Sequence, residues 1–291
     1  MLKAAEVSYE LGDYSKAMSA LNKFKTKAFK KLGKHNIYTP TYHLLSAKYS
    51  LASGYISEFE SSLYTAVNTS IAINQENSLE HILILIGGAH LNNLNGSYLD
   101  ARSYLTNSQK LFQGGAPLTD AIRAEWNVTL AEAMTGQGYY NEAIELLKEQ
   151  EKFYAGRAIK QETFVDDKGN LKSRKLSDEE VEARYNEYAR CLTLLGNAYG
   201  KQGSLKSSDS VFVFAANWIK RYMGESSIAY VKNQFLNANI LIENGNEDLP
   251  RELEYSTTLA NLKIKHKPTH MLAKGIFEET IKQLQRQDRS A

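Results

Sequence analysis

The chain has 291 residues, of which 43% are hydrophobic and 23% are charged, a composition typical of globular proteins. Its formal net charge of +2 does not by itself indicate nucleic-acid binding, and its one cysteine excludes an internal disulfide framework. No segment reaches the ~20 apolar residues that a membrane-spanning helix needs. We therefore expect a soluble protein, and nothing in the sequence requires a compartment other than the cytoplasm.

The chain begins with a predicted amphipathic helix, "MLKAAEVSYELG", which has no signal-peptide core and no N-terminal cap. A helix that begins without a cap predicts that the chain was cut from a longer protein. A full-length gene that begins at Met1 would contradict this prediction.

Residues 22–36 form a predicted helix that is rich in lysine. The lysines are Lys23, Lys25, Lys27, Lys30, Lys31 and Lys34, and the residues expected to face inward are Leu21, Phe24, Ala28 and Leu32. Lysines near a helix C-terminus complement the helix dipole. We interpret this face as a solvated outer surface, with binding to an acidic partner or an anionic surface as the alternative.

A glycine recurs along the chain at an interval of 42 residues. Gly12, Gly54, Gly96 and Gly138 follow one another at this interval, and Gly203 and Gly245 are again 42 residues apart. A small residue lies seven positions before each glycine, and we call these six the register residues. They are Ala5, Ala47, Ala89, Ala131, Gly196 and Ala238.

Three further positions keep the same phase after the glycine. Two residues after it are Tyr14, Ile56, Tyr98, Tyr140 and Leu205; five after it are Ala17, Phe59, Ala101, Ala143 and Ser208; nine after it are Leu21, Leu63, Leu105, Leu147 and Phe212. This pattern predicts helical hairpins. The glycine ends the first helix in a left-handed conformation, the residue two places on plugs the corner, and small residues allow close helix contact.

The pattern resembles the tetratricopeptide repeat, and residues 194–208, "LLGNAYGKQGSLKSS", match it best. The longer period resembles the repeats of kinesin light chains and of many bacterial proteins. The resemblance covers nearly the whole chain and implies an all-α, right-handed superhelix with six hairpins in a single domain over residues 1–291.

Two parts of the chain depart from the pattern. In the last copy, Glu247, Pro250 and Glu254 replace the expected packing residues, and residues 268–287 predict a closing helix. An insertion at about residues 155–177 separates the fourth and fifth hairpins. Its strand-like residues flank a turn at residues 167–170 and predict a β-hairpin or ordered loop. Ser177 and Glu180 form a predicted capping box that starts the next helix at about Asp178. The insertion is either a tolerated surface loop or a protrusion that contacts a partner.

The resemblance implies that the first helix of each hairpin lines a concave groove. The groove-facing positions of the family lie three before, one after, four after and five after each register residue. The partner-binding candidates at these positions are Lys48, His90, Asn93, Glu132, Asn197, Lys201, Phe235 and Asn239, with Arg190 and Lys232 nearer the helix starts. Asparagine offers a donor and an acceptor to a peptide backbone, and the cations can pair with acidic groups.

The first helix of the third hairpin, "HILILIGGAHLNNL", is apolar on almost all of its sides. Such a helix needs cover on both sides. Either neighbouring helices cover it, or apolar residues of a ligand occupy the groove.

No glycine-rich phosphate loop, nucleophile elbow or zinc motif occurs, and Pro268 lies between His266 and His270, the one metal-like pair. We therefore expect no enzyme activity, metal or cofactor, and predict a protein–protein interaction scaffold that binds a peptide segment or protein partner. The alternatives are a sensor or regulatory module of a longer signalling protein and a self-assembling structural protein that forms homo-oligomers.

Overall fold

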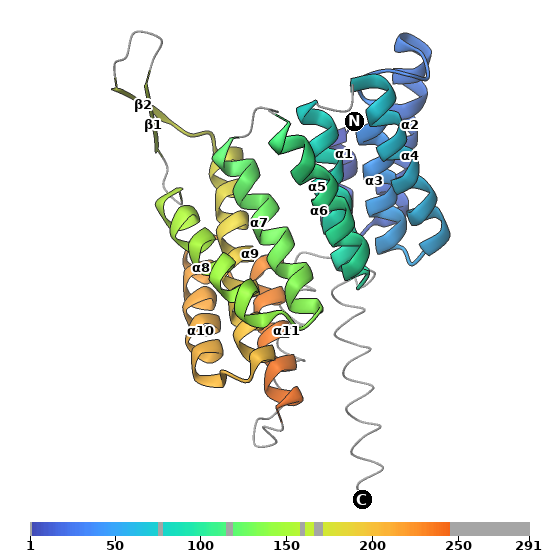
Figure 1. Cartoon of the computed structure of the whole chain (residues 1–291). Coiled ribbons are helices and arrows are strands. Elements are labelled where there is room, and N and C mark those ends of the chain that lie inside the picture. The colour runs from blue at the N-terminus through green and yellow to red at the C-terminus, as the bar shows by residue number, and fades with distance from the viewer. Residues whose placement is uncertain (1, 75–77, 115–118, 158–160, 166–170, 245–291) are drawn as a thin grey trace, which may run out of the picture. The chain divides into compact units, whose positions relative to one another are not determined.

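The computed structural model describes residues 2–74, 78–114, 119–157, 161–165 and 171–244. In this part of the chain the fold is all-α, with eleven helices and one two-stranded β-hairpin (Figure 1). The described residues form two compact units that divide between Gln137 and Gly138, which we call the first unit and the second unit. One continuous array over residues 1–291 stays a prediction.

The described part of the first unit consists of α1 (Leu2–Glu10), α2 (Tyr14–Leu32), α3 (Thr39–Ala52), α4 (Ile56–Asn74), α5 (Leu79–Leu94), α6 (Tyr98–Gln113) and α7 (Asp120–Gly136). The described part of the second unit consists of α8 (Tyr140–Arg157), β1 (Gln161–Val165), β2 (Leu171–Lys175), α9 (Asp178–Gln202), α10 (Leu205–Tyr222) and α11 (Ile228–Glu243). Consecutive helices pack as neighbours within each unit.

The helix boundaries follow the predicted interval. The first helices α1, α3, α5 and α7 end at residues 10, 52, 94 and 136, and the second helices begin at residues 14, 56, 98 and 140. The glycines between them have positive φ angles, from 77° at Gly12 to 88° at Gly138, and Gly203 has the same conformation. A residue without a Cβ adopts this conformation at little cost, which confirms the predicted role of these glycines. Gly245 lies outside the described residues.

The predicted contact positions form the core. The register residues are buried, and so are Leu21, Leu63, Leu105, Leu147 and Phe212, nine residues after each glycine. Gly196 shows why a small residue is needed: a Cβ at this position would lie 3.1 Å from the ring of Phe212. The prediction of close helix contact at these positions is confirmed in the first three hairpins and at Gly196.

The corner position differs between aromatic and aliphatic residues. Tyr14 is buried, and the ring of Tyr98 lies so close to the end of α7 that a Cβ at Gly136 would be 2.4 Å from it. Ile56 and Leu205 are 42% and 38% exposed, so the prediction that they plug a corner is wrong. Because their side chains are shorter than that of tyrosine, they reach less far into the corner and stay partly exposed to solvent.

Helix α5 is covered by its own chain. It packs against α3, α4, α6 and α7, and Ile82, Ile84 and Leu85, which lie on different sides of the helix, are at most 5% exposed. Of the two sequence-based explanations for this apolar helix, cover by neighbouring helices is therefore sufficient.

Helix α2 departs from its prediction at one residue. Leu21 and Ala28 face inward as expected, but Leu32, the last residue of the helix, is 48% exposed. Lys25 is not simply solvated, because its Nζ lies 4.9 Å from the centre of the Tyr42 ring, a cation–π distance.

The insertion forms an antiparallel hairpin, in which Gln161 pairs with Lys175 and Val165 pairs with Leu171. Helix α9 begins at Asp178, and the capping box of Ser177 and Glu180 is present. Both predictions are confirmed, although the predicted turn at 167–170 lies outside the described residues.

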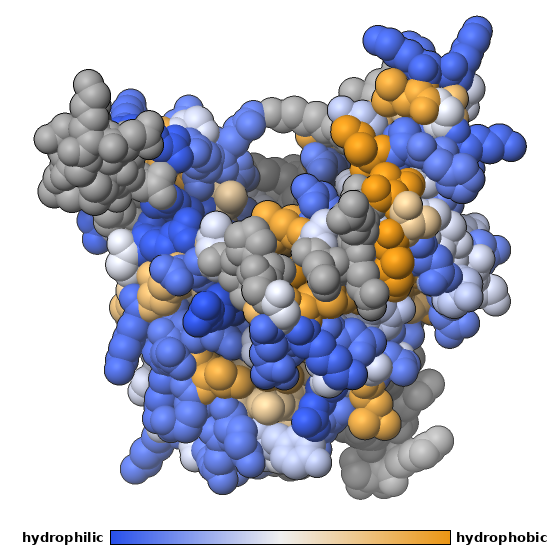
Figure 2. Space-filling model, turned by 45° about the horizontal axis from the view of Figure 1, so that its top comes forward, coloured by the Kyte–Doolittle hydropathy of each residue, from blue (hydrophilic) through white to orange (hydrophobic). Residues whose placement is uncertain are grey.

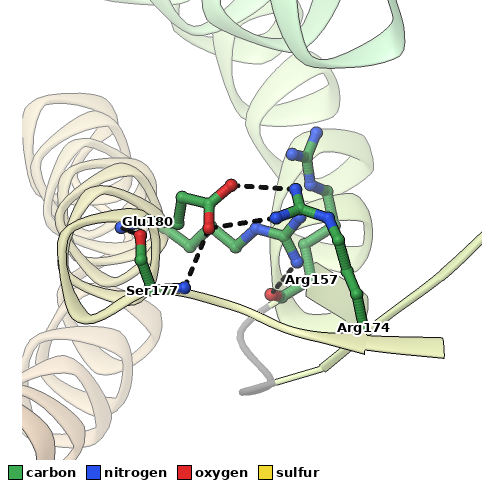
Figure 3. Close-up of polar contacts among 5 residues, drawn as sticks. Arg157, Arg174, Ser177 and Glu180 are labelled. Carbon is green, nitrogen blue, oxygen red and sulfur yellow. Dashed lines mark hydrogen bonds and ion pairs between the residues drawn. The ribbon is translucent and has the colours of Figure 1, made fainter.

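Arg174 connects β2 to the start of α9 (Figure 3). Its Nη2 donates to Glu180 Oε1 at 2.8 Å, and its Nη1 donates to Oε2 at 3.1 Å. Together with the Ser177 N–H, which donates to the same carboxylate, the Arg174 guanidinium lowers the pKa of Glu180 to about 2. The hairpin is thus held against α9 by a bidentate ion pair.

The last predicted elements fall beyond the described chain. These are the second helix of the sixth hairpin, the closing helix at 268–287, and the histidines His266 and His270.

Candidate functional site

The predicted groove residues lie on the first helices, and their burial depends on their position relative to the register residue. The residues four after it, here the plus-four residues, are Leu51, Asn93, Thr135 and Gly200. The residues one after it, here the plus-one residues, are Lys48, His90, Glu132, Asn197 and Asn239. Asn93, Thr135 and Gly200 are buried, whereas all five plus-one residues are half-buried.

The plus-four residues lie where successive first helices meet. Asn93 on α5 is 5% exposed, and its Nδ2 donates to the main-chain oxygen of Thr129 on α7 at 2.8 Å. On α9, a Cβ at Gly200 would lie 2.4 Å from Cγ2 of Ile240 on α11. Asn93, a candidate for partner binding, therefore lies inside a helix–helix interface instead of on an open surface.

The plus-one residues of the first unit make a charged surface. Nδ1 of His90 lies 3.5 Å from Oε2 of Glu132, with side chains 31% and 13% exposed, and the two form an ion pair when the imidazole is protonated. Lys48 Nζ lies 4.1 Å from the centre of the Tyr9 ring. These charged residues thus have interactions within the chain, and each still reaches the surface.

The plus-one residues of the second unit are amides. Asn197 on α9 and Asn239 on α11 occupy equivalent repeat positions on two helices that pack together. Asn239 takes part in a further interaction. The side chain of Asn197 makes no hydrogen bond to any described residue, so its donor and acceptor groups remain available.

Lys201, one residue beyond the plus-four position, is paired with another predicted groove position. Its Nζ donates to Oε1 of Glu243 at 2.7 Å, and both side chains are exposed. Arg190, Lys232 and Phe235 are half-buried and each takes part in a further interaction. The structure therefore brings α9 and α11 together, and the Lys201–Glu243 ion pair joins them.

Two buried polar contacts were not predicted from the sequence. Asn233 Nδ2 donates to Thr193 Oγ1 at 3.3 Å between α11 and α9, and Ser70 Oγ lies 2.5 Å from Nδ1 of His81. A serine next to a histidine is the start of a nucleophile–base pair. Here both residues are at most 3% exposed, so the contact stabilises packing between α4 and α5.

The surface in Figure 2 is mostly hydrophilic, with hydrophobic side chains in narrow stretches among the polar ones. None of the helices described is long and apolar enough to span a bilayer. Among the same residues, no three histidine, cysteine or acidic side chains lie together where they could hold a metal ion.

No protein-family model matches the chain, and a search of the curated proteins finds no similar sequence.

Proposed function

We propose that this chain is a tetratricopeptide-like repeat protein whose first helices bind an extended segment of a protein partner. The helix boundaries support the repeat, because the first helices of four successive hairpins end at intervals of 42 residues and the second helices begin at the same intervals. The register residues support it as well, because the small residue at this repeat position is buried in all six copies.

The observation that carries the binding proposal is the half-exposed amide of Asn197, which makes no hydrogen bond within the described chain and lies at the repeat position of Asn239. An amide presents a donor and an acceptor, which together match one peptide group of an extended chain. The nearby Lys201 and Glu243 offer a charge of each sign to the side chains of the segment. The work of this surface is binding without catalysis.

The test is capture of partners from the native lysate, followed by mass spectrometry, with three forms of the chain. The site variant carries Asn197→Ala and Asn239→Ala. The control variant carries Lys206→Ala and Asp209→Ala, which are exposed on the neighbouring α10. We expect a partner that the unmodified chain and the control retain and the site variant loses.

Retention of every partner by the site variant would contradict the proposal. Sedimentation at several concentrations separates this function from self-assembly, because a scaffold keeps its mass as concentration rises and a self-assembling protein does not.

A further inference from the structure

The first two hairpins carry a groove that none of the plus-one residues lines. It has a volume of about 1000 Å³ and runs between the outer face of α2 and the segment that joins α3 to α4. The α2 wall extends from Tyr14 to Lys27, and the opposite wall includes Ser53, Tyr55 and Glu58. Thirteen helical steps span about 20 Å, which equals the length of about six residues of an extended peptide.

The α2 wall is basic and rich in donors. Helix α2 has six lysines and no acidic residue, and two of these lysines, Lys23 and Lys27, line the groove. Both are exposed, and within the described chain neither forms an ion pair. Ser15 and Ser19 on the same wall add hydroxyl groups. This arrangement is electrostatically complementary to carboxylates.

The spacing of the two lysines restricts the ligand further. Lys23 and Lys27 are one helical turn apart, a rise of about 6 Å. In an extended peptide, side chains on the same side are two residues and about 6.6 Å apart. Carboxylates on alternate residues of a strand therefore match the two ammonium groups, whereas adjacent carboxylates point to opposite sides.

We propose that the groove between α2 and the α3–α4 segment binds an acidic, extended segment of a protein partner, with aspartate or glutamate at alternate positions that pair with Lys23 and Lys27. Glu58 on the opposite wall repels such a segment and limits its affinity. This surface is separate from the plus-one residues, so the proposal does not depend on the function proposed above.

The test is fluorescence anisotropy at low ionic strength with a labelled peptide of alternating glutamate and serine, long enough to span the groove. We expect saturable binding that Lys23→Gln with Lys27→Gln weakens about tenfold, the effect of losing two exposed ion pairs. Glu58→Gln should tighten it.

The matched control carries Lys30→Gln with Lys31→Gln, which removes the same charge from the same helix outside the groove. This control, and the variant with Asn197→Ala and Asn239→Ala, should bind the peptide like the unmodified chain. A failure of the first proposal would therefore leave this result unchanged.

Three outcomes would overturn the inference. One is the absence of saturable binding, and another is an equal loss of affinity in the two lysine pairs, which would indicate a diffuse charge effect. The third is equal binding of a short RNA, or of a peptide with the same number of glutamates at every third position, which places successive carboxylates on opposite sides of the strand, because either would show a general polyanion surface.

Discussion

The plus-four and plus-one residues lie on the same helices, in the same repeats, and have opposite environments. Asn93 is buried between α5 and α7, while Asn197 is half-exposed with its amide available. Three residues of a helix correspond to a rotation of about 300°, which places the two positions about 60° apart around the axis. That angle is enough to move a side chain from a helix interface to the surface.

This difference in burial means that asparagine has two different roles in the repeats. An asparagine at the plus-four position holds neighbouring helices together, and one at the plus-one position can meet a ligand. Residue identity alone does not distinguish them. We therefore expect the stability of the fold to depend on the plus-four residues and not on the plus-one residues.

The largest effect is expected for Gly200→Ala at a plus-four position. The new methyl group would overlap with Ile240, which is 1% exposed and has no space to move into. We expect a loss of about 2–3 kcal/mol in the free energy of unfolding, as for other overpacked cores. Urea denaturation followed by circular dichroism measures it.

Gly156→Ala is the matched control, because no atom lies within 4 Å of a Cβ at this helical position. This change should raise stability by about 0.5–1 kcal/mol. Equal destabilisation by both substitutions would show that any glycine-to-alanine change within a helix lowers stability, and that the plus-four position is not special.

Asn93→Ala should cost about 1–2 kcal/mol, because it removes the hydrogen bond to Thr129 and leaves a space between α5 and α7. Asn93→Leu fills the space with a somewhat larger apolar side chain, and leucine occupies the equivalent position 51. We expect the leucine variant to be more stable than the alanine variant in the same assay. If both variants were as stable as the unmodified chain, the plus-four assignment of Asn93 would be wrong.

Asn197→Ala with Asn239→Ala should change the free energy of unfolding by no more than about 0.5 kcal/mol, as for half-exposed polar residues outside an interface. Thermal unfolding of this variant beside Asn93→Ala gives the contrast directly. A loss as large as that of Asn93→Ala would place the plus-one residues in the interface too.

The smallest effect concerns an exposed contact, the Arg174–Glu180 pair. Because this pair lowers the pKa of Glu180 to about 2, its contribution is present above the ordinary pKa of 4.5 and is lost as pH falls towards 2. The protection factors of residues 171–175, which are corrected for the intrinsic pH dependence of hydrogen exchange, should fall over this range, whereas those of α5 should stay high. Arg174→Ala should shift this fall to higher pH, and an unchanged profile would contradict the role of the pair.

Some features of the candidate site could be predicted and others could not. The 42-residue period can be detected in the amino-acid sequence. It predicted that α9 and α11 are the first helices of successive hairpins, and it aligned Asn197 with Asn239. The burial of Asn93 could not be predicted, since it depends on how closely α7 approaches α5. The contact of Ser70 with His81 joins two helices without a spacing that a sequence pattern records.

The sequence by itself determined the helical hairpins, their glycine turns, the β-hairpin and the start of α9. These features depend on local conformation, which a glycine, a capping box or a helical period specifies within a few residues. Only the tertiary structure decided that Ile56 and Leu205 leave their corners exposed, that α5 is covered by four helices, and that α2 borders an open groove. These outcomes depend on the distances between helices, and those distances follow from the side chains of several segments packed together.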